Sequence, residues 1–109
     1  GVEVLTAVLK EANVETLRKM ADKFRERNPE SAVAVLACVV GERPMLIASV
    51  TDDLVKRGVK AGDLVKFVAT PLGGGGGGRP TLAQAGGKDA SKLDEALGSV
   101  VGWVKEKLK

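Results

Sequence analysis

The feature that most restricts the fold of this chain is an uninterrupted run of nine apolar residues, Ala32 to Val40. A membrane-spanning helix needs about 20 apolar residues, so this run is too short to cross a bilayer. Its valine content and its lack of polar interruptions are typical of a strand that is buried on both faces of a sheet. Because both faces must then be covered, the sequence predicts an α/β (α+β) fold, a small mixed β-sheet covered by helices.

The N-terminal part of the chain supplies a strand and a helix. A strand is predicted at Val2–Leu9, where β-branched residues partly alternate with others. An amphipathic helix is expected after the N-cap Asn13. That helix must end near Asn28, because Pro29 restricts the backbone of the residue before it.

The C-terminal part is expected to add two more strands and three helices. In chain order we predict a turn at Gly41–Pro44, a hairpin strand at Met45–Val50, a short helix at Asp52–Arg57 capped by Thr51, a helix from about Ala61 to Leu72, a glycine loop at Gly73–Gly78, a short edge strand at Thr81–Ala85 and a last helix to about Leu108. Asp89 or Ser91 is expected to cap the last helix, and Ser91 with Asp94 resembles a capping box. The main order is thus β-α-β-β-α-(Gly-rich loop)-α.

Composition excludes several kinds of chemistry. The 109 residues, enough for one domain, include no histidine and one cysteine. The usual zinc sites and the Ser-His-Asp and Cys-His constellations therefore cannot form. Cys38 lies inside the apolar run and is expected to be a small buried hydrophobe. The N-terminus has no signal-peptide pattern, so we expect a cytoplasmic fragment cut at a domain boundary.

Positive charge gathers in the second half of the chain. The net charge is +3, and residues 54–92 hold seven basic side chains against two acidic ones. This local excess suits a phosphate-bearing partner, although an ordinary solvated surface would look the same.

Six consecutive glycines, Gly73 to Gly78, lie within this basic region. Ordering them costs more backbone entropy than ordering any other residues, so they form either a mobile linker or a backbone that must come very close to something. Lysine at 88 is followed by aspartate, which excludes a Walker loop. A second glycine pair and a cation are expected immediately before a helix N-terminus, which attracts phosphate. The candidate binding residues are Gly73, Gly74, Gly75, Gly76, Gly77, Gly78, Arg79, Gln84, Gly86, Gly87, Lys88 and Lys92.

The spacing Gly-Arg-Pro followed by Ala-Gln-Ala-Gly-Gly within Gly73–Gly87 resembles the C-terminal globular domain of alanyl-tRNA synthetases, which belongs to the DHH-associated domain family. The flanking segments Lys60–Lys66 and Lys88–Leu97 resemble the same family, so the resemblance covers essentially the whole chain. It implies that residues 1–109 are a single tRNA-binding domain of a larger synthetase. Such a domain contacts the elbow of tRNA(Ala) and helps one tRNA engage both the aminoacylation and the editing sites. The resemblance implies no catalytic residues, no metal and no cofactor in this domain, because ATP and zinc belong to other domains of the parent enzyme.

Two other functions stay open at this point. The domain could be the nucleotide-binding half of a DHH-type phosphoesterase, but the metal motif of that family needs histidine, which this chain lacks. It could instead be mainly structural, forming a homodimer through the apolar stripe of the last helix. DNA could bind as well as tRNA. The three aromatic residues, Phe24, Phe67 and Trp103, are expected to pack in the core rather than stack on bases.

Overall fold

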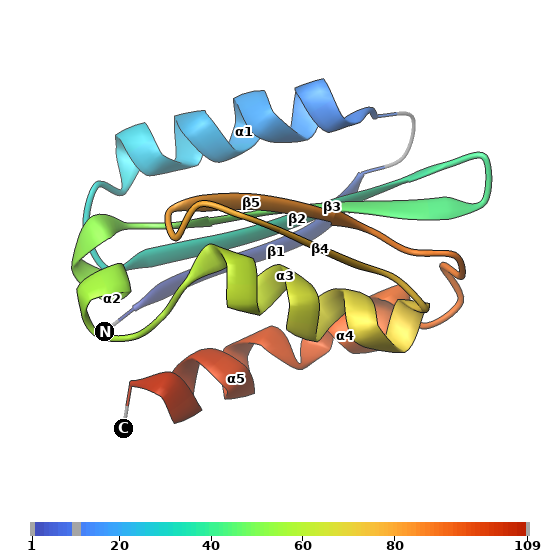
Figure 1. Cartoon of the computed structure of the whole chain (residues 1–109). Helices are drawn as coiled ribbons and strands as arrows, with labels where there is room; N and C mark the ends of the chain where they lie inside the picture. The colour runs from blue at the N-terminus through green and yellow to red at the C-terminus, as the bar shows by residue number, and fades with distance from the viewer. Residues whose placement is uncertain (1, 10–11, 109) are drawn as a thin grey trace.

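The computed structural model describes residues 2–9 and 12–108. The strands are β1 (Glu3–Leu9), β2 (Ala32–Val40), β3 (Arg43–Val50), β4 (Gly75–Gly78) and β5 (Leu82–Gly86), and the helices are α1 (Val14–Arg27), α2 (Asp52–Lys56), α3 (Ala61–Ala69), α4 (Leu93–Gly98) and α5 (Val100–Lys107). The strands form one sheet in the order β1-β2-β3-β5-β4, with β1 and β2 parallel and the other neighbours antiparallel. Helix α1 covers one face, and α3, α4 and α5 cover the other (Figure 1). The predicted mixed sheet covered by helices is confirmed.

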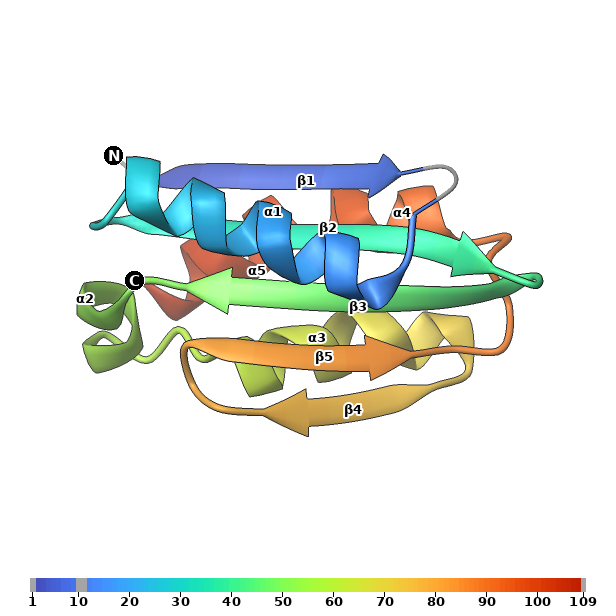
Figure 2. The same ribbon diagram turned by 90° about the horizontal axis from the view of Figure 1, so that it is seen from above.

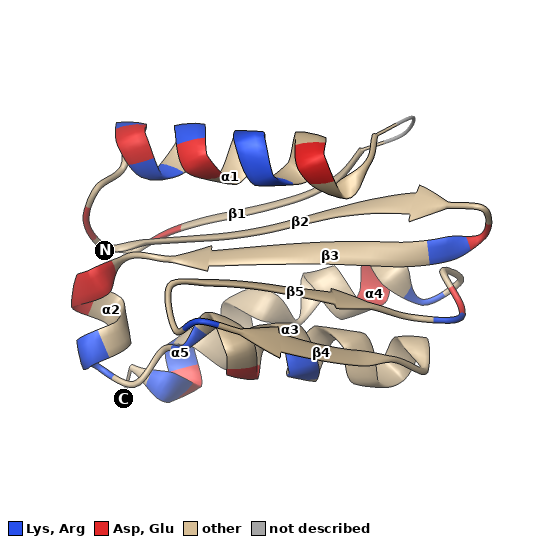
Figure 3. Ribbon diagram, turned by 45° about the horizontal axis from the view of Figure 1, so that its top comes forward, with Lys and Arg blue, Asp and Glu red and all other residues tan. Residues whose placement is uncertain are grey.

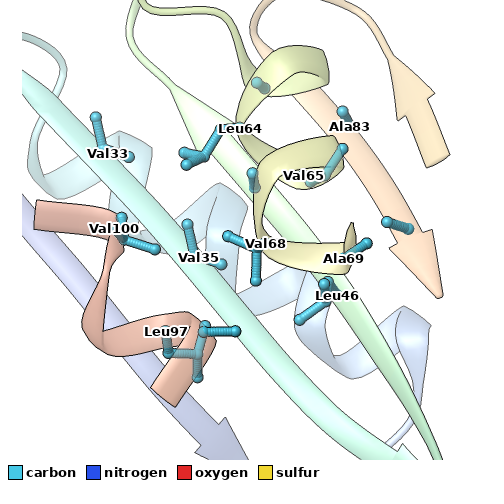
Figure 4. Close-up of a cluster of buried hydrophobic side chains, with 14 of the residues drawn as sticks. Val33, Val35, Leu46, Leu64, Val65, Val68, Ala69, Ala83, Leu97 and Val100 are labelled. Atoms are coloured by element: carbon cyan, nitrogen blue, oxygen red, sulfur yellow. The ribbon is translucent and has the colours of Figure 1, made fainter. Parts of the chain in front are cut away.

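The central strand β2 is buried on both faces, as its sequence predicts. Residues 32–38 are at most 1% exposed. Val33 and Val35 belong to the larger core beneath α3, α4 and α5, part of which Figure 4 shows. Leu36 and Cys38 belong to the smaller core beneath α1. The prediction of a buried cysteine is confirmed, and burial raises the pKa of the Cys38 thiol.

Helix α1 begins and ends at the predicted residues. The Asn13 side chain accepts a hydrogen bond from the Thr16 amide at 2.9 Å, and the Asn28 amide donates to the Phe24 carbonyl at 2.9 Å just before Pro29. Parallel strands need a crossover connection, and α1 provides it between β1 and β2. The crossover lays α1 diagonally across the sheet, as Figure 2 shows.

A small polar cluster fixes the start of β2. Asp53 accepts hydrogen bonds from the Ser31 amide at 2.9 Å and the Ser31 hydroxyl at 3.1 Å, where Ser31 has a left-handed φ of 53°. Thr51 stands at the N-cap of α2, but its hydroxyl accepts from the Ala32 amide at 3.2 Å and makes no capping bond to the helix. Hydrogen bonds with Thr51 first, and then with Ser31, lower the pKa of Asp53.

The predicted glycine loop is wrong for Gly75–Gly78, which form the edge strand β4. The predicted edge strand at Thr81–Ala85 exists as β5, displaced by one residue, but it lies inside the sheet between β3 and β4. Glycine-rich sequence gives no hydrophobic alternation, and here pairing with β5 decides the conformation. The long helix predicted to reach Leu72 stops at Ala69 and continues as one 3₁₀ turn, η1 (Thr70–Leu72), which contains Pro71.

The last helix is also corrected, because it is two helices rather than one. Ser99 lies between α4 and α5, and its hydroxyl donates to the Ala96 carbonyl at 2.6 Å, a local bond of the kind that bends helices. The predicted capping box is absent, because Lys92 is the N-cap and Asp89 accepts from the Ser91 amide at 2.9 Å in the preceding turn.

The apolar stripe of α4 and α5 is covered within the domain. Its members from Leu93 to Val104 that face the sheet are at most 5% exposed and belong to the larger core. Val101 is 43% exposed and is not part of this buried surface. The stripe therefore gives no reason to expect a dimer through this helix. Among the described residues, none of the helices is long and apolar enough to span a membrane.

Candidate nucleic-acid interface

The glycines of β4 divide into two kinds according to what their missing side chains would meet. A methyl group built on Gly76 would lie 2.5 Å from the Ala85 Cα atom of β5, and one built on Gly78 would lie 2.8 Å from the Ala83 Cα atom. A methyl group on Gly75 would meet nothing within 4 Å, and one on Gly77 would only touch Lys66 at 3.8 Å. The even-numbered glycines are therefore required by packing against β5, whereas Gly75 and Gly77 present bare backbone outward.

One side of the β4–β5 hairpin borders a groove beneath α1. The Arg18 guanidinium on α1 donates to the Gln84 side-chain oxygen on β5 at 2.9 Å, across 66 residues of sequence. A hollow of about 400 Å³ beside this bond is lined by Arg18, Gly77, Gly78, Arg79 and Gln84 together with apolar residues of the sheet. A second hollow of about 600 Å³ continues along α1, shares Arg18 and Gln84 with the first, and is also lined by Lys19 and by the acidic Glu15 and Asp22. We call the two together the α1 groove.

The other side of β4 borders a smaller hollow against α3. It measures about 140 Å³, and its lining includes Gly77 and Gly78 together with two basic residues, Lys60 and Lys66, and one acidic residue, Asp63. The two glycines thus line hollows on both sides, so β4 is a thin backbone wall between them. Cationic side chains stand on each side of this wall, Arg18 and Arg79 in the α1 groove and the two lysines against α3. Figure 3 shows how little charge the strands carry compared with the helices and turns that surround them.

The structure separates the predicted binding residues into two groups. Arg79 lies in the turn between β4 and β5, and it lines the same hollow as Gln84. Lys88 and Lys92 follow the other end of β5, whose five residues span roughly 13 Å. One phosphate group cannot contact both groups. Hydrogen bonds from Ser91 lower the pKa of Asp89, so a carboxylate also accompanies the second group of cations.

The glycines near this second group serve the fold. The Gly87 amide donates to the Pro44 carbonyl at 3.0 Å, and the Lys88 amide donates to the Leu72 carbonyl at 2.9 Å. A methyl group on Gly87 would lie 2.8 Å from the Leu72 Cβ atom. Gly86 pairs with Met45 of β3, and Gly73, with a φ of 74°, ends η1. The expectation that Lys88 stands immediately before a helix N-terminus is wrong, because α4 begins only at Leu93.

Sequence reasoning missed Arg18, Lys60 and Lys66 as members of the site. Each lies on the polar side of a helix or at its start, which is where ordinary solvated residues lie, so no local signal distinguishes them. Only the packing of α1 and α3 against the sheet brings them to β4.

Of the aromatic residues, Phe67 differs from expectation, whereas Trp103 packs against the larger core. Phe67 is 39% exposed rather than in the core, and its ring centroid lies 6.0 Å from that of the half-buried Trp103. Within the described ranges, no cluster of three or more histidine, cysteine or acidic residues could hold a metal ion.

Comparisons with known proteins agree with this architecture. The DHHA1 domain family matches residues 1–106. The alanine–tRNA ligase of Geobacillus kaustophilus is 57% identical over 105 residues, which cover 96% of this chain and 12% of that protein. The alanine–tRNA ligase of Methylobacillus flagellatus is 49% identical over 109 residues, 100% of this chain and 12% of that protein. This chain therefore spans only 12% of the length of these curated relatives.

Solved structures give the same picture at the level of one domain. The crystal structure of the C-Ala domain from Aquifex aeolicus alanyl-tRNA synthetase has a TM-score of 0.81 and 33% identity, covering 99% of this chain and 95% of that one. A DHH domain structure, 22% identical with a TM-score of 0.57 over 91% of this chain, shares the fold.

Proposed function

Because this chain belongs to the DHHA1 domain family and is a C-Ala domain of the alanyl-tRNA synthetase type, we propose that it holds tRNA(Ala) through the β4–β5 hairpin without catalysing a reaction itself. The observation that carries the proposal is the backbone wall of Gly77 and Gly78 between two hollows in whose linings basic side chains outnumber acidic ones. A ribose-phosphate chain can lie flush against such a wall, since Gly75 and Gly77 carry no side chain of their own and the neighbour at Gly77 is the flexible, cationic Lys66.

The chemistry of these contacts suits positioning rather than sequence reading. Arginine forks and lysine ammonium groups neutralise phosphates, and phosphate contacts carry little sequence information. The tRNA would then be recognised largely by the shape of its elbow, because the grooves of helical RNA hide most base edges from side chains. Holding the elbow in this way would let one tRNA engage both the aminoacylation and the editing domains of a cytoplasmic parent enzyme. ATP and zinc would serve those domains and not this one.

Within this site we assign Arg18, Arg79 and Gln84 to the principal contact. Arg18 and Gln84 hold each other at 2.9 Å, so both polar groups enter the α1 groove in a fixed arrangement. Lys88 and Lys92 would meet a different stretch of the same RNA, beyond the far end of β5. Duplex DNA, with its different helical shape, is expected to bind more weakly than tRNA at equal ionic strength.

A salt titration of the 109-residue chain against tRNA(Ala) tests the proposal. Each phosphate contact that is lost should reduce the salt-dependence slope by about one, so Arg18→Ala and Arg79→Ala should each flatten it. Arg27→Ala is the matched control. It removes the same charge as the test variants, and Arg27 is exposed at the other end of α1. The proposal fails if tRNA does not bind the wild-type chain at low ionic strength, or if the control flattens the slope as much as the test variants do.

The size of the α1 groove supports a second candidate function. The hollow of about 400 Å³ beside the Arg18–Gln84 bond has the size of a small-ligand site, which would suit the nucleotide-binding half of a phosphoesterase. A mononucleotide that displaces tRNA at comparable concentration would favour that function, whereas displacement only by polymeric RNA favours the tRNA-binding role.

A further inference from the structure

Helices α3 and α5 carry a partly exposed aromatic pair that the groove contacts do not use. Phe67 on α3 is 39% exposed, and its ring lies at a centroid distance of 6.0 Å and an angle of 30° to that of Trp103 on α5. The Lys107 ammonium lies 5.3 Å from the centre of the Trp103 ring, within the range of a cation–π contact. We call these three side chains the aromatic shelf.

The shelf continues the surface of the glycine strand. Lys66 precedes Phe67 on the exposed side of α3, and its Cε atom lies 3.8 Å from where a methyl group on Gly77 would stand. Bare backbone, a cation, two aromatic rings and a second cation therefore follow one another from β4 to α5. Figure 1 shows α3 between β4 and α5, in agreement with this order.

We propose that the aromatic shelf stacks against an exposed base of the RNA whose phosphates lie along β4, an inference that rests on the proposed function. Bases stack on aromatic side chains without sequence preference, and lysines beside the rings suit the flanking phosphates. The small apolar area argues against a protein partner. Among the described residues, the exposed large apolar side chains on α3 and α5 are Phe67 and Val101 alone. Two side chains cannot supply the roughly 800 Å² that each partner buries in a stable interface.

Trp103 makes the contact directly observable, because it is the single tryptophan of the chain. The wild-type 109-residue chain is titrated with tRNA(Ala) while its tryptophan fluorescence is recorded, and stacking is expected to quench the emission. Phe67→Leu keeps an apolar side chain but removes the ring, and we expect it to weaken binding by about 5- to 100-fold. Its salt slope should match the wild type, because stacking releases no counterions.

Val101→Ala is the matched control, since it removes exposed apolar surface from α5 but no ring. Circular dichroism melting checks that both variants remain folded. If tRNA binds the wild type with unchanged Trp103 emission, and Phe67→Leu binds as tightly, the stacking proposal is overturned while the tRNA-binding role stands. If wild type binds no tRNA, the proposed function itself fails. Emission that changes with protein concentration in the absence of RNA, together with a faster-sedimenting species, would assign the shelf to a second copy of the chain and overturn the proposal.

Discussion

Replacing Gly76 with alanine tests why β4 consists of glycine residues, namely that its backbone lies directly against β5. The new methyl group would stand 2.5 Å from the Ala85 Cα atom and closer still to the Gln84 carbonyl oxygen, whereas ordinary contacts begin at 3.4 Å. Both neighbours are backbone atoms of a strand held on its other side by β3, so they cannot swing aside as a flexible side chain can. β4 itself must retreat by about 1 Å, and the substitution then acts like overpacking of a core.

The energetic consequence follows from that retreat. Overpacking costs about 1–3 kcal/mol, and stretching the β4–β5 hydrogen bonds places Gly76→Ala toward the upper end of that range. Gly75→Ala is the matched control, because its methyl group meets nothing within 4 Å and its φ lies outside the left-handed region. At such a position, restricting the unfolded chain raises the unfolding free energy by about 0.4–1 kcal/mol. The two variants should therefore differ by about 3 kcal/mol.

Urea denaturation followed by circular dichroism measures this difference. With a slope of about 1–3 kcal/mol per M, the two midpoints should be separated by about 1 M or more. Amide exchange at β5 should also quicken in Gly76→Ala, because its outer partner strand has moved away. Equal midpoints for the two variants would refute the alternation of packed and open glycines along β4, and with it the reason for the glycine run.

Three further predictions concern stability. The Ser49 hydroxyl is 1% exposed and has no hydrogen-bond partner within residues 2–9 and 12–108, so Ser49→Ala should raise the unfolding free energy by about 1 kcal/mol, and a lower urea midpoint would contradict this. Cys38→Ser buries a hydroxyl in the smaller core and should lower the unfolding free energy by about 1–3 kcal/mol, which an unchanged midpoint would disprove. The folded pKa of Asp53 lies below its ordinary value of 3.8. The stability that its ionised carboxylate gives the folded state is therefore complete above that value and is lost as pH falls through the folded pKa. Thermal melts should accordingly show Asp53→Asn less stable than wild type at neutral pH, with the gap closing in acid, and a gap independent of pH would exclude this role for the carboxylate.

Several elements are determined by the local sequence. The apolar run Ala32–Cys38 has no polar residue to place in water, so a strand buried on both faces is its natural conformation. Asn13 and Pro29 act on backbone groups within a few residues of themselves, and α1 accordingly begins and ends beside them. The β2–β3 hairpin is equally local, since its turn lies between two apolar strands. The family resemblance of the glycine, arginine and glutamine spacing also comes from sequence alone.

Tertiary structure alone decided how the candidate site is assembled. Glycine has no side chain and hence no period, so only the fit of β4 between β5 and α3 makes Gly75–Gly78 a strand. Arg18 reaches Gln84 because the crossover helix passes over the sheet, a relation that no spacing within either segment expresses. Lys88 is near Arg79 in sequence but distant from it in space, because the extended strand β5 separates them. Periodicity reports which face of an element is buried, whereas the neighbour that buries it depends on contacts between residues far apart in the chain.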